Sequence, residues 1–180
     1  MSLLSYWELK ALVDEGVITE VKSDQINASS IDLTIGEHIK IEANDYNGQT
    51  VVLRDHDRLN MIDRYMDEDG YHLRPGQFIL AHSEQKFNLP PNVSAEYKLK
   101  SSMARIGLEH LNAGWCDAGW HGSVLTLELK NMTQHHTIHI QPKDYIGQIV
   151  FFRHEPVPMD KSYAQRGRYN NDGTVTGAKK

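Results

Sequence analysis

Residues 97–131 read YKLKSSMARIGLEHLNAGWCDAGWHGSVLTLELKN and carry both a clear strand pattern and most of the reactive side chains. Polar and apolar residues alternate through VLTLELK (124–130), which is the period-two pattern of a half-buried strand. The alternation breaks at Ser102–Ile106, where we predict a turn of helix that begins near Ser101. Glycine-containing turns separate these pieces. The stretch therefore predicts short strands joined by tight turns.

The segments on either side continue this pattern. IDLTIG (31–36) and HIKIEA (38–43) alternate polar and apolar residues. Further short strands are predicted at Val51–Leu53, Gln77–Ala81, Ala95–Leu99, Val124–Lys130, Thr137–Ile140 and Ile146–Phe152. Turn signals separate several of them, at Asn47-Gly48, Asp69-Gly70, Pro75-Gly76 and Pro90-Pro91. Many short strands with turns between them favour a mainly β fold, either a sandwich or a barrel.

Three segments differ from the strands. Ser5–Gly16 predicts a short amphipathic helix, with Ser5 as the N-cap and Glu8 three residues further on. Asp55–Tyr71 is charged, and we expect it to form a solvated connection. From Lys161 the chain is polar and rich in glycine and asparagine, so it should be mobile alone and could order over a ligand or a neighbouring subunit. We expect one domain over residues 1–160 and a tail over residues 161–180.

The composition limits the possible functions. A chain of 180 residues suits one domain, and its net charge of −5 argues against a nucleic-acid-binding face, which needs clustered cations. The single cysteine, Cys116, excludes an intramolecular disulfide and a multi-cysteine zinc site. The N-terminus lacks a secretory pattern, and no apolar run approaches the ~20 residues of a membrane span. We expect a cytoplasmic protein that binds neither nucleic acid nor membrane.

The segment from Lys100 to Arg105 combines cations with hydroxyl groups. A strand that ends in Ser101-Ser102 and turns into a helix presents hydroxyls and free backbone N–H groups together, and such groups attract anions. Lys100 and Arg105 add positive charge, and an arginine can bind phosphate through two hydrogen bonds. The same six residues also fit an ordinary helix start with solvated cations. A phosphate-binding site is therefore one of two interpretations.

Two acidic residues are candidates for chemistry. Glu128 faces the opposite side of its strand from Leu127 and Leu129, so it either faces solvent or lies in a cleft where desolvation raises its pKa. In a cleft it could take a proton from an attacking water. Asp117 lies in a hairpin bracketed by glycines and fits either a turn residue or a contact to a sugar hydroxyl. His110 suits either a water-positioning or a structural role.

Several motifs together resemble the dCTP deaminase branch of the dUTPase-like superfamily. They are KSSMARIGL, EHLNAGWCDAGWHGSVLTLEL and KDYIGQIVF, with softer matches at SSIDLTIG, at FNLPPNVSAEYK and in the tail. The resemblance covers nearly the whole chain. It implies a distorted β-barrel or jelly roll with a short N-terminal helix. It also implies a homotrimer with active sites shared between subunits, and hydrolytic deamination of dCTP to dUTP and ammonia.

The resemblance also implies roles for particular residues. Glu128 resembles the general base, Arg105 the arginine that supports the water and the glutamate, and Ser101 a member of the phosphate and water network. Magnesium is expected on the nucleotide phosphates, and zinc is not expected, since one cysteine cannot build the H-x-E…P-C-x-x-C signature. The other positions implied to bind substrate are Lys100, Ser102, His110, Asn112, Ala113, Asp117, Trp120, Gln148, Tyr163, Arg168 and Asp172.

The chain departs from the family pattern at several of these positions. Lys100 stands where arginine is usual, Asn112 replaces threonine, and Asp172 stands where the tail usually offers glutamine. The segment between Gly122 and Glu128 is one residue longer, which could shift the strand register. These departures leave open a 5-substituted cytosine, or a mono- or diphosphate, as the substrate.

Two other functions fit the same residues. One is a dUTPase, or a bifunctional deaminase and diphosphatase that forms dUMP, because Asp117 is retained. Glu128 favours deamination, since dUTPase chemistry needs no glutamate at this position. The other is a nucleotide-binding regulatory protein without turnover.

Overall fold

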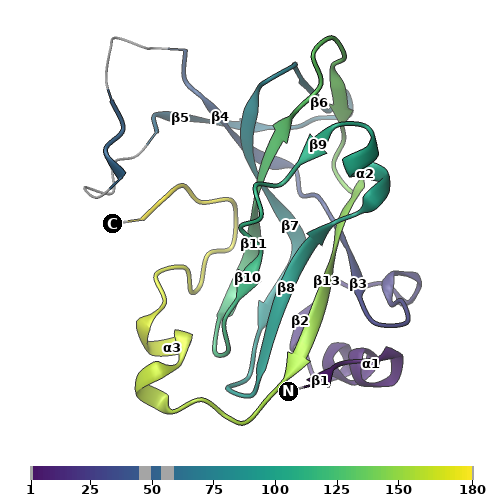
Figure 1. Ribbon diagram of the computed structural model, residues 1–180, viewed down its shortest axis with the longest axis vertical. Helices are drawn as coiled ribbons and strands as arrows, with labels where there is room; N and C mark the ends of the chain where they lie inside the picture. Colours follow the sequence, from purple (N-terminus) through teal and green to yellow (C-terminus); the bar gives the residue numbers. More distant parts are fainter. Residues whose placement is uncertain (1, 45–49, 54–58, 180) are drawn as a thin grey trace.

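The computed structural model describes residues 2–44, 50–53 and 59–179 (Figure 1). Short antiparallel strands dominate it. The helical elements are α1 (Tyr6–Asp14), η1 (Ser23–Gln25), α2 (Ser101–Arg105), η3 (Met159–Lys161) and α3 (Tyr163–Arg166). The strands are β1 (Ser2–Leu3), β2 (Ile18–Thr19), β3 (Ile31–Thr34), β4 (His38–Glu42), β5 (Met61–Tyr65), β6 (Tyr71–Leu73), β7 (Phe78–Asn88), β8 (Val93–Leu99), β9 (Leu108–Glu109), β10 (Trp115–Cys116), β11 (His121–Asn131), β12 (Ile138–Ile140) and β13 (Tyr145–Arg153).

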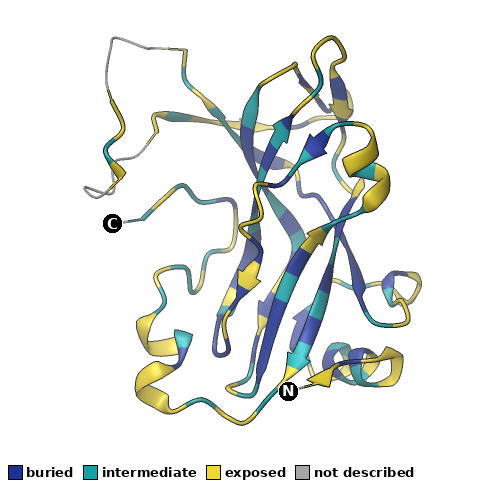
Figure 2. Ribbon diagram, in the orientation of Figure 1, coloured by how far each residue is buried: buried dark blue, intermediate teal, exposed yellow. Residues whose placement is uncertain are grey.

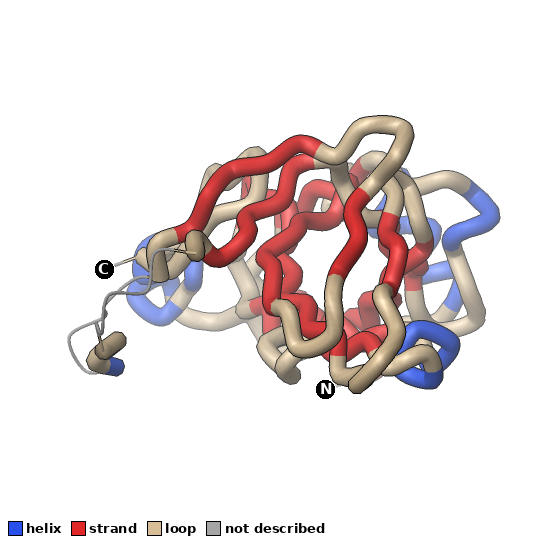
Figure 3. Tube along the Cα trace, turned by 90° about the horizontal axis from the view of Figure 1, so that it is seen from above, coloured by secondary structure: helices blue, strands red, loops and turns tan. Residues whose placement is uncertain are grey.

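Two sheets enclose the core. One runs β1-β13-β8-β10, with β3 also paired to β13, and the other runs β5-β4-β7-β11-β9, with β2 also paired to β7. β6 and β12 form a separate two-stranded sheet. Seen from above, the strands curve around a shared interior (Figure 3). Neither large sheet closes on itself, so the fold is jelly-roll-like, and the prediction of a mainly β fold of this type is confirmed.

The predicted N-terminal helix is also confirmed. α1 begins after Ser5, whose backbone N–H donates to the Glu8 carboxylate at 3.1 Å. Leu9 and Leu12 are 0% and 2% exposed, so one face of the helix joins the core. None of the helices within the described ranges is long and apolar enough to cross a membrane.

The β4–β5 hairpin departs from the sequence predictions. Residues 61–65, inside the segment expected to be a solvated connection, form β5, which pairs with β4 from Met61↔Glu42 to Tyr65↔His38. Val51–Leu53 was expected to be a strand and is not one. β5 is stabilised by main-chain pairing to β4, and most of its side chains are exposed. Because the strand buries no regular apolar face, the alternation pattern did not predict it. The predicted Asn47-Gly48 turn and residues 55–58 lie outside the described residues.

β11 is the strand that places the site. It pairs with β7 along most of its length, with register shifts between His121 and Ser123 and between Val124 and Thr126. The second shift lies between Gly122 and Glu128, in the segment that is one residue longer than the family pattern. A β-bulge adds one residue to a strand, so a bulge here would accommodate the extra residue. Beyond the bulge, Leu127 and Leu129 are 1% and 0% exposed and fix the direction of the strand's side chains.

The C-terminal tail follows the free part of β11. β9 pairs only with Lys130 and Asn131, so the earlier part of the β11 edge is open to another partner. Asn171 donates its backbone N–H to His121 O at 3.0 Å, and Val124 donates to Asp172 O at 2.9 Å. Val175 is 1% exposed. The structure packs the tail on its own chain, along the free edge of β11 and with Val175 buried (Figure 1). That the tail is mobile alone and orders over a ligand or a neighbouring subunit stays a prediction.

Gly147 of β13 tests how tightly the core is packed. A Cβ built there would lie 2.1 Å from Tyr97 Cε2, and the Tyr97 side chain is buried and has no room to retreat. We expect Gly147→Ala to lower the free energy of unfolding by about 1–3 kcal/mol, because overpacking a core forces strain. Urea denaturation would measure it. Gly173→Ala is the control, since no atom lies within 4 Å of its built Cβ. Equal stability of the two variants would contradict this packing.

Candidate active site

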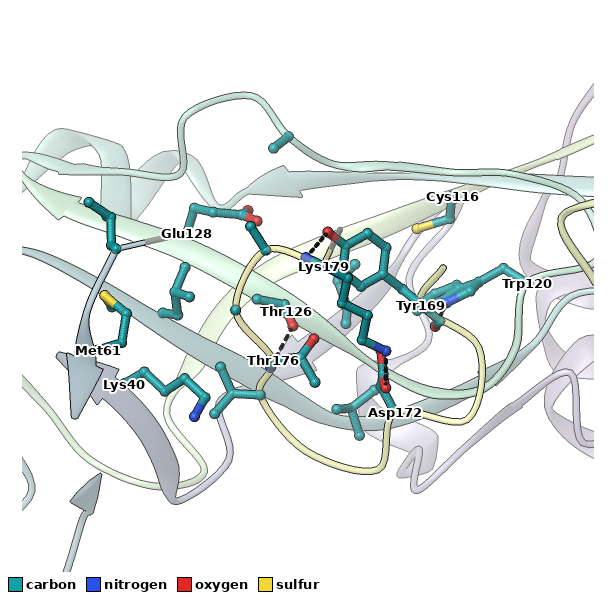
Figure 4. Close-up of a pocket in the computed structure, with 18 of the residues that line it drawn as sticks. Lys40, Met61, Cys116, Trp120, Thr126, Glu128, Tyr169, Asp172, Thr176 and Lys179 are labelled. Carbon is teal, nitrogen blue, oxygen red and sulfur yellow. Dashed lines mark hydrogen bonds and ion pairs between the residues drawn. The ribbon is translucent and has the colours of Figure 1, made fainter. Parts of the chain in front are cut away.

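A cavity of about 910 Å³ lies against β11. The tail, the β4–β5 hairpin and the turn around β10 form its other walls (Figure 4). This size is near the upper end of the range for small-molecule sites, roughly 300–1,000 Å³. The cavity can therefore hold a ligand as large as a nucleotide.

Glu128 lines this cavity from β11. The buried leucines on either side point into the core, so the glutamate must point the other way, into the cavity rather than to open solvent. Burial raises the pKa of Glu128 to about 7, with a backbone hydrogen bond acting in the opposite direction. A carboxyl group that titrates near neutral pH can accept and return protons under physiological conditions. Of the two sequence interpretations, the cleft is the one observed.

The turn around β10 supplies a second carboxylate. Asp117 is exposed, lines the cavity, and accepts a hydrogen bond from Trp115 Nε1 at 2.9 Å. Ala113 and Trp120 line the cavity from the same region. Cys116 is fully buried, and burial together with the Asp117 charge raises the pKa of its thiol to about 12. Cys116 therefore stays protonated and is a structural residue.

The tail closes the opposite side of the cavity. Trp120 Nε1 donates to Tyr169 O at 2.8 Å, and Ser123 Oγ donates to the same carbonyl at 2.7 Å. These bonds hold the tail where Tyr163, Tyr169 and Asp172 line the cavity. The chain thus builds part of its own cavity wall from its last residues.

The phosphate-binding candidates do not line this cavity. The predicted helical turn is present as α2, but Ser101, Ser102 and Arg105 are exposed on it and lie outside the cavity lining (Figure 2). Lys100 Nζ instead contacts Asp32 Oδ2 at 2.5 Å. Gln148 Oε1 accepts a hydrogen bond from Ser30 Oγ at 3.1 Å. A single chain therefore keeps its Ser-Ser-Arg segment apart from Glu128.

The remaining candidates do not line the cavity. His110 is 8% exposed, and burial lowers its pKa, so the ring is neutral at physiological pH. Its Nδ1 and the hydroxyl of Tyr97 are buried without hydrogen-bond partners among the described residues, and the two rings pack edge to face. Asn112 is exposed with φ 55. Arg168 Nη1 donates to Lys179 O at 3.5 Å.

The sequence reasoning missed several lining residues, above all Lys40 and Lys179. Lys40 lies between Ile39 and Ile41, so the alternating pattern predicts that its side chain points away from the core. The local sequence does not indicate that β4 reaches the cavity that Glu128 lines. Lys179 gives no sequence signal, because a lysine near a chain end is ordinarily solvated.

The described residues contain no group of three or more His, Cys, Asp or Glu side chains placed to hold a metal ion. Magnesium typically keeps several waters and binds one or two carboxylates together with substrate phosphates. The carboxylates in the cavity fit that kind of binding, and magnesium stays a prediction.

An open jelly-roll-like fold with a nucleotide-sized cavity lined by three carboxylates, those of Asp117, Glu128 and Asp172, fits a hydrolase that acts on small molecules. Residues 3–154 match the dCTP deaminase-like family, and the chain belongs to that family. A relative from Nanoarchaeum equitans named "dCTP deaminase, dUMP-forming" is 33% identical, over 92% of this chain and 90% of its own length. A relative of the same name from Persephonella marina is 32% identical, over 98% and 96%.

Solved structures agree on the fold. The 2'-deoxycytidine 5'-triphosphate deaminase from Agrobacterium tumefaciens superposes with a TM-score of 0.64 at 22% identity, over 83% of this chain. This chain spans about half of that one, 47%. The dUTPase from Streptococcus mutans superposes with a TM-score of 0.50 at 17% identity, over 76% of this chain and 87% of that chain.

The relatives' names correct the predicted reaction. We expected deamination that ends at dUTP, and this is wrong, because the curated relatives are named as dUMP-forming. The alternative that produces dUMP agrees with them. Asp117 lines the same cavity as Glu128, so a second carboxylate lies beside the one assigned to deamination in the sequence analysis.

The raised pKa of Glu128 predicts how stability depends on pH. The folded-state pKa of about 7 exceeds the ordinary 4.5, so folding favours the protonated form. Stability is then full below about pH 4.5 and is lost as the pH rises through 7, by up to about 3 kcal/mol. Glu128→Gln should therefore exceed the parent in stability at pH 8.5 and match it near pH 4.5. Urea denaturation at both pH values would measure this, with the exposed Glu155→Gln as the control. A gain of the same size at both pH values would argue against a buried titrating group.

Proposed function

We propose that this protein converts dCTP to dUMP by two hydrolytic steps in one cavity. The observation that carries the proposal is the half-buried Glu128, whose pKa is raised to about 7, lining the same cavity as the exposed Asp117. The names of the curated relatives support the same pair of steps. Such an enzyme would act on the deoxynucleotide pool in the cytoplasm, without nucleic acid or membrane partners.

In the first step water adds to C4 of the cytosine ring. Glu128 accepts the proton of the attacking water as the new C–O bond forms. It delivers this proton to N3, then takes the remaining proton from the new C4 hydroxyl and passes it to the exocyclic amine. The C4 carbonyl forms as the C–N bond breaks, and ammonia leaves. The products are dUTP and ammonia. A carboxyl group with a pKa near 7 suits both halves of this transfer, since it holds and releases a proton with similar ease.

In the second step water attacks the α-phosphorus of dUTP. Asp117 takes the proton of this water, the bond between the α-phosphorus and the bridging oxygen breaks, and diphosphate leaves with the former bridging oxygen. The product is dUMP. Asp117 is exposed and accepts a hydrogen bond from Trp115 Nε1. Magnesium, bound through the phosphates, would neutralise charge on the leaving group.

We further propose that a second copy of the chain completes the phosphate end of the site, within a homotrimer. The support is the separation within one chain: Ser101, Ser102 and Arg105 lie exposed on α2, away from the cavity that holds Glu128. A neighbouring subunit that presents its α2 to this cavity would supply hydroxyls and a guanidinium for the phosphates and the attacking water.

Two variants separate the two steps. Glu128→Gln should lose ammonia release from dCTP by at least about 10²-fold, since it removes the proton acceptor, and should still convert dUTP to dUMP. Asp117→Asn keeps a hydrogen-bonding side chain but no base, so it should deaminate dCTP and accumulate dUTP. Chromatography of the nucleotides together with an ammonia assay measures both. Near-parental ammonia release by Glu128→Gln would show that another group is the base.

Mixing two inactive variants tests the shared site. Arg105→Ala and Glu128→Gln should each be inactive alone, whereas co-expressed chains should form mixed oligomers in which about a quarter of the sites combine an intact α2 with an intact Glu128. Activity should return toward that fraction of the parental rate. Co-expression of Glu128→Gln with Glu128→Ala is the control, because no site can regain the base. Failure of the first pair to recover activity would place α2 and Glu128 of one chain in the same site.

A further inference from the structure

Lys179 lies inside the Glu128 cavity, tied down by contacts with its own tail. Its Nζ lies 2.6 Å from each carboxylate oxygen of Asp172, and the two side chains are 33% and 14% exposed (Figure 4). The backbone N–H of Lys179 donates to the Tyr169 hydroxyl at 3.1 Å, and its ammonium lies 5.3 Å from the Tyr169 ring centroid. These contacts hold Lys179 against the cavity wall.

The hydrogen bonds of this ammonium are fully used. A lysine ammonium has three N–H donors, and those of Lys179 are directed at the two oxygens of Asp172 and at Arg168 O, which lies 3.0 Å away. Lys179 can therefore bind another anion only if that anion takes the place of the Asp172 carboxylate. This makes Lys179 and Asp172 an exchangeable pair rather than two separate contacts.

The charges in the cavity favour such an exchange. Among the described residues that line it, Asp117, Glu128 and Asp172 are acidic, and Lys40 and Lys179 are basic. Lys40 is already held by Asp63 at 2.5 Å. A triphosphate brings more negative charge than one carboxylate, so it competes well for an ammonium, whereas a monophosphate competes less well. Without Lys179 the wall near Asp172 would repel a polyanion.

We propose that Lys179 is a phosphate-binding residue of this active site and that Asp172 is the counterion that the nucleotide's polyphosphate replaces. The inference rests on the proposed function, since it takes the ligand to be a deoxynucleoside triphosphate. When diphosphate leaves, the ammonium loses its stronger partner and returns to Asp172. The exchange thus makes the cavity select triphosphates and release the monophosphate product.

Binding measurements on the full-length protein test the exchange. The Glu128→Gln background prevents deamination, and an α,β-imido analogue of dCTP prevents release of diphosphate, so calorimetry can compare this analogue with dCMP. Lys179→Met should weaken binding of the imido analogue about tenfold and binding of dCMP less than twofold, because the lost contact is made to the distal phosphates. Lys161→Met is the matched control: it is a tail lysine, 63% exposed and outside the cavity, and should change neither affinity.

Asp172→Asn provides the complementary arm. It removes the competing carboxylate, so it should tighten binding of the imido analogue, and this gain should vanish in the double variant with Lys179→Met. If Lys179→Met bound the imido analogue as tightly as the parent or more tightly, the inference would be overturned, because Lys179 would then obstruct the cavity instead of binding phosphate. If Asp172→Asn weakened binding of the imido analogue and of dCMP equally, the inference would also be overturned, because Asp172 would then contact the nucleoside that both ligands share. If the Glu128→Gln parent bound neither ligand, the proposed function would fail together with the inference.

Discussion

The direction of one side chain on β11 determines what this cavity can do. Leu127 and Leu129 are anchored in the core, and the pleat of the strand then turns Glu128 into the cavity. The carboxyl group is held away from water, and its pKa rises to about 7 for that reason. The apolar packing that stabilises the fold thus also places a carboxyl group that titrates near neutral pH in the cavity. The fold bears the cost of this burial, because an ionised group there opposes folding.

The same strand determines where the tail lies. β11 is paired with β7 on one edge, whereas β9 covers only its last residues on the other. The tail fills the uncovered part of that edge with backbone hydrogen bonds, and the buried Val175 adds apolar contact. An edge strand left open would invite pairing with other chains. Covering it with the chain's own end removes that risk and brings Tyr169, Asp172 and Lys179 to the ligand cavity.

The sequence predicted what depends on local pattern. Alternation located β11 and β13, and the Ser-Ser-containing turn located α2, because side-chain period and turn residues act over a few positions. It missed β5, whose stability comes from pairing with β4, and it missed Lys40 and Lys179, which reach the cavity only through distant contacts. Whether Glu128 faced solvent or a cleft also needed the tertiary structure. The alternating sequence pattern predicts which side chains share a face of a strand. Only the tertiary structure shows whether that face lies against the core, a cavity or solvent.

The separation of cations from Glu128 has a chemical consequence. Among the described residues no lysine or arginine is paired with this carboxylate, and burial alone raises its pKa. A guanidinium placed beside it would favour the ionised form and lower the pKa. If Arg105 arrives from a neighbouring subunit, its charge would shift this half-ionised glutamate further toward the carboxylate in the assembled site, where a water and a pyrimidine are also held. Assembly would then increase the fraction of charged base, whereas in the isolated chain burial disfavours that uncompensated charge.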